Sequence, residues 1–112
     1  MNKVAIIVAG GAGKRMGSEL PKQFLMLHNK PVLYHTLNTF LSAYDDLQIV
    51  LVLAEDYVDM GREIIDAYFE NDRIRIAVGG TTRFDSVKNG LALVGDEAII
   101  FVHDAVRCSL TT

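Results

Sequence analysis

Runs of apolar residues divide the chain into candidate strands. Lys3 to Val8 and Leu47 to Leu53 are rich in β-branched and aliphatic residues, as is typical of strands buried on both faces. Ala98 to Val102 is a third run of this kind. Arg73 to Val78 instead alternates polar and apolar residues and precedes a pair of glycines. That alternation predicts a half-exposed or edge strand.

Three segments between these runs show the spacing of amphipathic helices. Pro31 occupies the expected first position of one helix, Tyr57 to Phe69 predicts a second, and Arg83 to Leu93 a third. The residues that we expect on the inner faces are Leu33, Leu37, Phe40 and Leu41 in the first helix, Val58, Ile64, Ile65 and Phe69 in the second, and Val87, Leu91 and Leu93 in the third.

The predicted elements follow the order β-loop-α-β-α-β-α-β. Strands that alternate with helices favour an α/β fold with a mostly parallel sheet and helices on both faces. Ligands of such sheets bind beyond the carboxyl ends of the strands. This rule selects Gly10 to Lys22, Gly79 to Arg83, and His103 to Arg107. No helix is predicted after the last strand, so we expect the chain to be truncated.

Composition narrows the class of protein. Half of the 112 residues are hydrophobic, which is enough for one folded domain. The net charge of −3 argues against a nucleic-acid partner, and the longest apolar runs are too short to cross a bilayer. Cys108 is the single cysteine, so an intrachain disulfide is impossible and a cytoplasmic location is expected.

Positive charge is concentrated near the N-terminus. The first 31 residues carry five basic residues and one acidic residue, whereas the other 81 carry six basic and thirteen acidic residues. Lys14, Arg15 and Lys22 lie in or just after a glycine cluster. This local excess of positive charge favours a small anionic ligand such as a phosphate.

The glycine cluster at residues 10–13 lets backbone N–H groups approach a ligand closely. It is not a Walker A loop, because Val8 stands where that motif needs glycine. Nor is it a dinucleotide fingerprint, because Met16 stands at its closing glycine or alanine. Arg15 offers a planar fork and Lys22 a compact charge, a combination that suits a triphosphate.

Three segments together resemble the 2-C-methyl-D-erythritol 4-phosphate cytidylyltransferase family. They are V-A-G-G-A-G-K-R-M-G-S-E-L-P-K-Q-F-L (Val8 to Leu25), G-G-T-T-R-F-D-S-V-K-N-G-L (Gly79 to Leu91) and V-H-D-A-V-R (Val102 to Arg107). The first segment alone is shared with many sugar nucleotidyltransferases, whereas the combination is specific. The resemblance implies a Rossmann-like nucleotidyltransferase sheet. Residues 1–112 would be the N-terminal, CTP-binding half of the family's single domain.

The resemblance also implies an activity, which is transfer of CMP from CTP to 2-C-methyl-D-erythritol 4-phosphate with release of pyrophosphate, in non-mevalonate isoprenoid synthesis. Arg15 and Lys22 would be catalytic, Asp104 would bind Mg²⁺, and Arg107 would contact the acceptor. The residues implied in nucleotide binding are Ala9, Gly10, Gly11, Gly13, Gly80, Thr81, Arg83, Ser86 and Ala105.

The chain departs from the family pattern at three positions. Thr81 stands where an acid is common, Val106 where alanine is usual, and Cys108 where proline is usual. The family's dimer arm and a later active-site lysine would lie beyond Thr112. We therefore expect a homodimer for the full-length protein and no activity for the 112 residues alone.

Other interpretations stay open. Ribitol 5-phosphate cytidylyltransferases share these motifs, and sugar-1-phosphate nucleotidyltransferases use other bases. A truncated module could bind nucleotide without turnover. Ser86 fits a ligand contact and a plain helix-face serine equally well. His103 has no second metal-binding residue near it in the sequence and is interpreted as a structural hydrogen-bonding residue.

Overall fold

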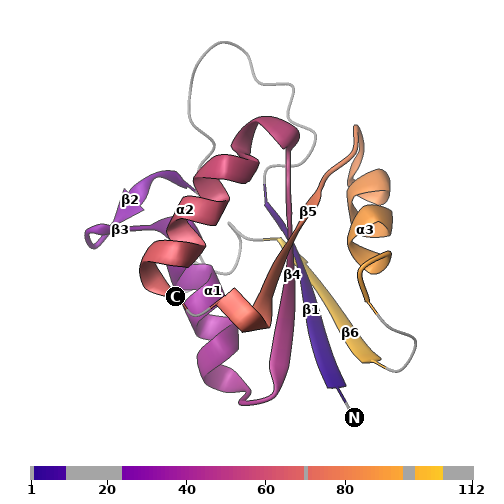
Figure 1. Cartoon of the computed structure of the whole chain (residues 1–112), viewed down its shortest axis with the longest axis horizontal. Coiled ribbons are helices and arrows are strands. Elements are labelled where there is room, and N and C mark those ends of the chain that lie inside the picture. Colours follow the sequence, from indigo (N-terminus) through magenta and orange to yellow (C-terminus); the bar gives the residue numbers. More distant parts are fainter. Residues whose placement is uncertain (1, 10–23, 70, 95–97, 105–112) are drawn as a thin grey trace.

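The computed structural model describes residues 2–9, 24–69, 71–94 and 98–104. Four strands in these ranges form one parallel sheet (Figure 1). In spatial order they are β5 (Ile74–Val78), β4 (Leu47–Leu53), β1 (Asn2–Ala9) and β6 (Ala98–Asp104). The expected parallel sheet is therefore confirmed.

The register aligns the carboxyl ends of the strands at one edge of the sheet. Ala9 of β1 lies opposite Leu53 of β4, and Leu53 lies opposite Val78 of β5. On the other side of β1, Val8 lies opposite Asp104 of β6. Any loop that leaves these strands therefore starts at the same edge, where α/β sheets bind their ligands.

Helices cover both faces of the sheet. The helices α1 (Val32–Ala43) and α2 (Val58–Tyr68) lie on one face, and α3 (Arg83–Leu91) lies on the other (Figure 1). Successive strand residues point to opposite faces, so one strand contributes to both cores. Ile7 packs in the core on the α1 and α2 side, whereas Ile6 packs in the core that includes Val87 of α3.

Most of the predicted elements are present with small shifts at their ends. Leu47–Leu53 forms a strand with the predicted bounds, and β6 extends two residues further than expected, through His103 and Asp104. Pro31 is the N-cap of α1 instead of its first residue, with φ of −60°. The edge position of β5 is confirmed, because β4 is its only partner among the described strands.

The inner face of α3 differs in part from the prediction, since of the expected residues only Val87 packs against the sheet. Leu91 and Leu93 are 41% and 38% exposed, so their expected inward positions were wrong. Ser86 and Gly90 instead face the sheet and are buried. These small residues let the helix approach the strands closely, so that the larger leucines are left at the side.

The third helix, α3, approaches the sheet closely at Gly90. A Cβ atom there would lie 3.0 Å from methyl groups of both Ile6 and Val52. Those two residues belong to the two central strands. The absence of a side chain at Gly90 therefore sets how closely the third helix packs on the sheet.

A short hairpin of β2 (Met26–Leu27) and β3 (Lys30–Pro31) precedes α1 and was not predicted. His28 and Asn29 form its two-residue turn with φ of 53° and 69°. Two successive positive φ angles are the backbone pattern of a type I′ hairpin turn. His35 Nε2 lies 2.7 Å from the carbonyl oxygen of Leu27, so α1 fixes the hairpin in place.

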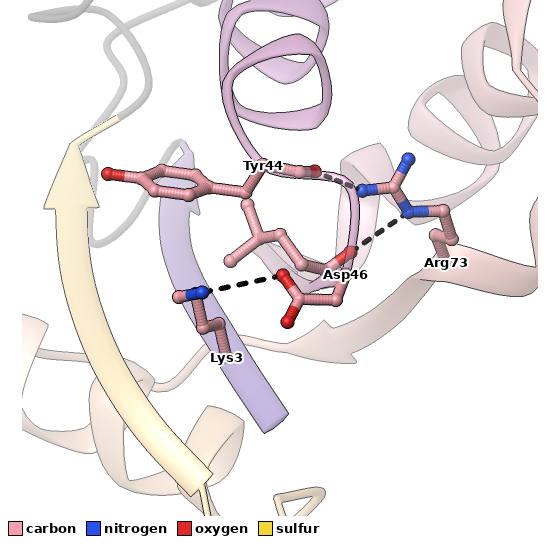
Figure 2. A network of polar contacts seen from close by, with 5 residues as sticks. Lys3, Tyr44, Asp46 and Arg73 are labelled. Carbon is pink, nitrogen blue, oxygen red and sulfur yellow. Dashed lines mark hydrogen bonds and ion pairs between the residues drawn. The ribbon is translucent and has the colours of Figure 1, made fainter. Parts of the chain in front are cut away.

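Polar contacts at the amino edge of the sheet hold the connection between α1 and β4 (Figure 2). Arg73 donates from Nε to the carbonyl oxygen of Leu47 at 3.0 Å and from a terminal nitrogen to that of Tyr44 at 2.7 Å. Lys3 Nζ lies 3.5 Å from Asp46 Oδ1. These contacts lie at the opposite end of the strands from the carboxyl edge.

None of the helices in the described part of the chain is long and apolar enough to cross a membrane.

Candidate functional site

The three segments selected from the sequence begin at the carboxyl edge of the sheet. The segment from Gly10 follows β1, that from Gly79 follows β5, and His103 and Asp104 are the last residues of β6. Because β1 and β6 are neighbours, the register brings the main chain of Asp104 next to that of Val8. Ala9, an implied nucleotide-binding residue, is 1% exposed at the end of β1.

Several predicted site residues cannot be placed. For Arg83 and Asp104 the structure describes only the main chain. The predicted site residues that lie outside the described ranges are Gly10, Gly11, Gly13, Arg15, Lys22, Ala105 and Arg107. The structure therefore brings together the strand ends that would carry these groups, and the roles of the groups stay predictions.

The described part of the site is the turn at residues 79–82, between β5 and α3. Gly79 donates its N–H to the carbonyl oxygen of Leu53 at 2.7 Å, which ties the start of the turn to β4. Gly80 donates its N–H to Ser86 Oγ at 3.1 Å. A Cβ atom on Gly80 would clash with the Cβ atom of Asp85. Only glycine permits this close approach of the turn to the helix.

The second half of the turn caps α3. Thr82 Oγ1 accepts the N–H of Asp85 at 3.0 Å, which satisfies one of the free donors of the first helical turn. Thr81 donates its hydroxyl to Asp85 Oδ2 at 3.2 Å. Thr81 and Thr82 are both exposed, so solvent and ligands can reach this side of the turn.

Ser86 has a defined structural partner. Its side chain is 0% exposed, and its oxygen accepts the hydrogen bond from Gly80. It is therefore more than the plain helix-face serine considered from the sequence, since it joins the helix to the turn. The hydroxyl keeps one proton to donate. The contact of Ser86 with a nucleotide stays a prediction.

The sequence analysis missed two residues that support this turn. Asp85 packs against Gly80 and accepts from Thr81, and Asn89 Nδ2 donates to the carbonyl oxygen of Val78 at 2.9 Å. Their signal in the sequence is their spacing. Positions 85 and 86 come four and three residues before position 89, so each is a neighbour of Asn89 on the surface of a helix that begins just after the turn.

Comparison with known proteins places this arrangement in a family. The sequence model of the 2-C-methyl-D-erythritol 4-phosphate cytidylyltransferase family matches residues 3–112. The protein named 2-C-methyl-D-erythritol 4-phosphate cytidylyltransferase from Bacteroides fragilis is 50% identical over 107 residues, which are 96% of this chain and 49% of that one.

Solved structures agree with the sequence match. The 4-diphosphocytidyl-2C-methyl-D-erythritol synthase of Anaerococcus prevotii superposes with a TM-score of 0.70 at 28% identity, over 95% of this chain and 44% of that one. The 2-C-methyl-D-erythritol 4-phosphate cytidylyltransferase of Francisella tularensis gives 0.68 at 29% identity, over 95% and 45%. The chain thus spans about half the length of these relatives. With the family match over almost all of its residues, the chain belongs to the 2-C-methyl-D-erythritol 4-phosphate cytidylyltransferase family.

Proposed function

We propose that the protein transfers CMP from CTP to 2-C-methyl-D-erythritol 4-phosphate and releases pyrophosphate, as a step in non-mevalonate isoprenoid synthesis. The observation that carries the proposal is the family match over residues 3–112. The parallel sheet supports it, because all three segments with candidate chemistry start at the carboxyl edge of the sheet.

In the proposed reaction a phosphate oxygen of the acceptor attacks the α-phosphorus of CTP in line with the leaving pyrophosphate. Transfers of this kind depend on positioning and on charge stabilisation more than on covalent catalysis. Arg15 and Lys22 would place positive charge where negative charge develops. The backbone N–H groups of Gly10, Gly11 and Gly13 would hold the phosphates.

The cytosine and ribose would bind between the end of β1 and the 79–82 turn. Hydrogen bonds from the turn to β4 and α3 support this assignment, because a rigid turn can hold a base without first being ordered. The residues proposed to line this part of the site are Ala9, Gly80, Thr81, Arg83, Ser86 and Ala105.

Asp104 is the proposed ligand of Mg²⁺. Among the described side chains no three His, Cys, Asp or Glu residues gather into a group that could hold a metal. A single carboxylate at the end of β6, beside β1, fits Mg²⁺, which is often held by one or two carboxylates together with substrate phosphates and water. When bound, the ion would neutralise charge on the triphosphate.

The remaining parts of the proposal concern the acceptor and the setting. Arg107 would contact the phosphate of the acceptor. The full-length protein would act as a homodimer in the cytoplasm, without a nucleic-acid or membrane partner. The lone Cys108 and the net charge of −3 support this setting.

A pyrophosphate-release assay tests the proposed function. The full-length protein that carries this sequence would be supplied with CTP, Mg²⁺ and either 2-C-methyl-D-erythritol 4-phosphate or ribitol 5-phosphate. We expect faster turnover with the first acceptor, and a preference for CTP over UTP and GTP. Faster turnover of ribitol 5-phosphate would show that 2-C-methyl-D-erythritol 4-phosphate is not the preferred acceptor. A preference for another nucleotide would contradict cytidylyl transfer. Nucleotide binding without any turnover would contradict an enzymatic activity.

A further inference from the structure

Asn89 makes a contact that the proposed mechanism does not use. It lies near the end of α3, and its side-chain amide donates to the carbonyl oxygen of Val78 at 2.9 Å. Val78 is the last residue of β5 and immediately precedes the 79–82 turn. The contact therefore joins the helix to the strand end from which the turn leaves.

Three consecutive residues are each fixed to a different partner. The carbonyl oxygen of Val78 accepts from Asn89, the N–H of Gly79 donates to Leu53, and the N–H of Gly80 donates to Ser86. Two of these bonds lead to α3 and one leads to β4. Together they fix the direction in which the chain leaves the sheet.

The hydrogen bond from Asn89 matters for the position of Val78, because β5 is an edge strand with a neighbouring strand on one side. Among the described strands, β5 has only β4 as a neighbour, and the side chain of Val78 is 46% exposed. Without the amide of Asn89, the end of this strand would lose its hydrogen bond to that side chain of α3. The turn would then be held to the helix through the bond from Gly80 to Ser86 and through its exposed threonines.

We propose that Asn89 is a positioning residue that presets the 79–82 turn for nucleotide binding. This inference rests on the proposed function, and adds that Asn89 acts through the carbonyl of Val78 without touching the nucleotide. An ordered turn binds with a smaller loss of conformational entropy. The contact should therefore contribute to CTP affinity more than to the rate of the chemical step.

Two substitutions in the full-length protein test the role. Asn89→Asp keeps the shape of the side chain but turns a donor into a negatively charged acceptor that faces a carbonyl oxygen. Asn89→Ala removes the contact without adding charge, and alanine favours the helix, so that this variant should stay folded. The matched control is Asn38→Asp, a change at an exposed asparagine on α1 whose Oδ1 lies 3.5 Å from Ser42 Oγ.

The measurements are the dissociation constant of CTP, kcat at saturating CTP, and the hydrogen exchange of the Gly80 amide without nucleotide. For both Asn89 variants we expect the dissociation constant to rise about fivefold while kcat changes less than about twofold. We also expect faster exchange at Gly80, and no such changes in the control.

An unchanged CTP dissociation constant, or a loss confined to kcat, would overturn the proposal. Slow, unaltered exchange at Gly80 would overturn it as well. If the unsubstituted protein does not bind CTP, the proposed function fails and the nucleotide role of Asn89 fails with it. In that case faster exchange at Gly80 would still show that Asn89 positions the turn.

Discussion

Thr82 and Thr39 show how the contribution of a threonine hydroxyl to stability depends on its position in a helix. Thr82 Oγ1 accepts an N–H at the start of α3, whereas Thr39 donates to the carbonyl oxygen of His35 four residues earlier in α1. The first bond satisfies a donor that the helix leaves free. The second adds a bond to a carbonyl within the helix, where alanine has the higher helix propensity.

We therefore expect Thr82→Ala to lower the free energy of unfolding by about 1 kcal/mol. Thr39→Ala should change it by less than about 0.5 kcal/mol in either direction. Urea unfolding of the two variants, followed by circular dichroism, measures both values. Equal losses would contradict the capping role of Thr82.

Lys22 is the residue whose proposed role is most directly testable by kinetics. Its charge is proposed to act where negative charge develops in the transition state, so Lys22→Ala should lower kcat by about 100-fold or more. The dissociation constant of CTP should change far less, because ground-state binding uses many other contacts.

Lys30→Ala is the matched control for the loss of a lysine. Lys30 lies on β3, with its Nζ 5.5 Å from the centre of the Tyr34 ring, and the proposed site does not use it. Steady-state kinetics and CTP titration should leave this variant close to the unsubstituted protein. Equal losses of turnover and of affinity in Lys22→Ala would refute a transition-state role.

At the scale of the element, small residues determine how closely α3 packs on the sheet. Gly90 lies under methyl groups of Ile6 and Val52, while Leu91 is 41% exposed. Gly90→Val should lower the free energy of unfolding by about 1–3 kcal/mol, because the added methyl groups overpack the interface with the sheet.

Leu91→Ala is the control, with an expected change of about 1 kcal/mol or less, because this side chain is partly exposed to solvent. Chemical denaturation of both variants gives the comparison. A larger loss for Leu91→Ala than for Gly90→Val would mean that α3 packs through its leucines.

These elements show what the sequence could and could not predict. Strands such as Leu47–Leu53 were predictable, because a run of aliphatic residues needs burial on both faces. The inner face of α3 was predictable only in part. Val87 packs against the sheet as expected, but apolar spacing identifies large residues, and this helix also packs through Ser86 and Gly90. The hairpin at His28 and Asn29 was missed because it lacks the glycine that usually marks a type I′ turn.

The position of the candidate site in the fold was predictable to a similar extent, whereas the roles of its residues stay predictions. The pattern of strands located the three segments at one edge of the sheet. Gly80 and Thr81 do lie in one turn, which is hydrogen-bonded to Ser86 and Asp85 of α3. The supporting roles of Asp85 and Asn89 depend on which side of α3 faces the turn. That orientation is fixed by the close packing at Gly90, which residue spacing alone did not reveal.

At the scale of the whole molecule, the two edges of the sheet have different chemistry. The amino edge carries Arg73 with its two carbonyl partners and the ion pair of Lys3 with Asp46 (Figure 2). The carboxyl edge carries the candidate site. Substitutions at the amino edge should therefore change stability without changing nucleotide affinity.

Arg73→Lys tests this separation. Lysine lacks the planar fork that reaches two carbonyl oxygens, so the free energy of unfolding should fall by about 1 kcal/mol. The CTP dissociation constant, measured by titration, should stay the same.

The control is Asp46→Asn, which breaks the ion pair with Lys3, whose two side chains are 34% (Lys3) and 59% (Asp46) exposed. It should cost less than about 0.5 kcal/mol, and less still at high salt. A weaker affinity in Arg73→Lys would show that the two edges are coupled.

The pairing of Val8 with Asp104 has a consequence for the protein while it is being made. The first strand leaves the ribosome early, yet one of its two neighbours is the last strand described. At about 5–20 residues per second, the side of β1 that receives β6 waits roughly 5 to 20 seconds for its partner. The main chain of Asp104 comes to lie next to that of Val8 only when that strand arrives. If the proposed function holds, we expect nucleotide to stabilise only those nascent chains in which β6 has paired with β1.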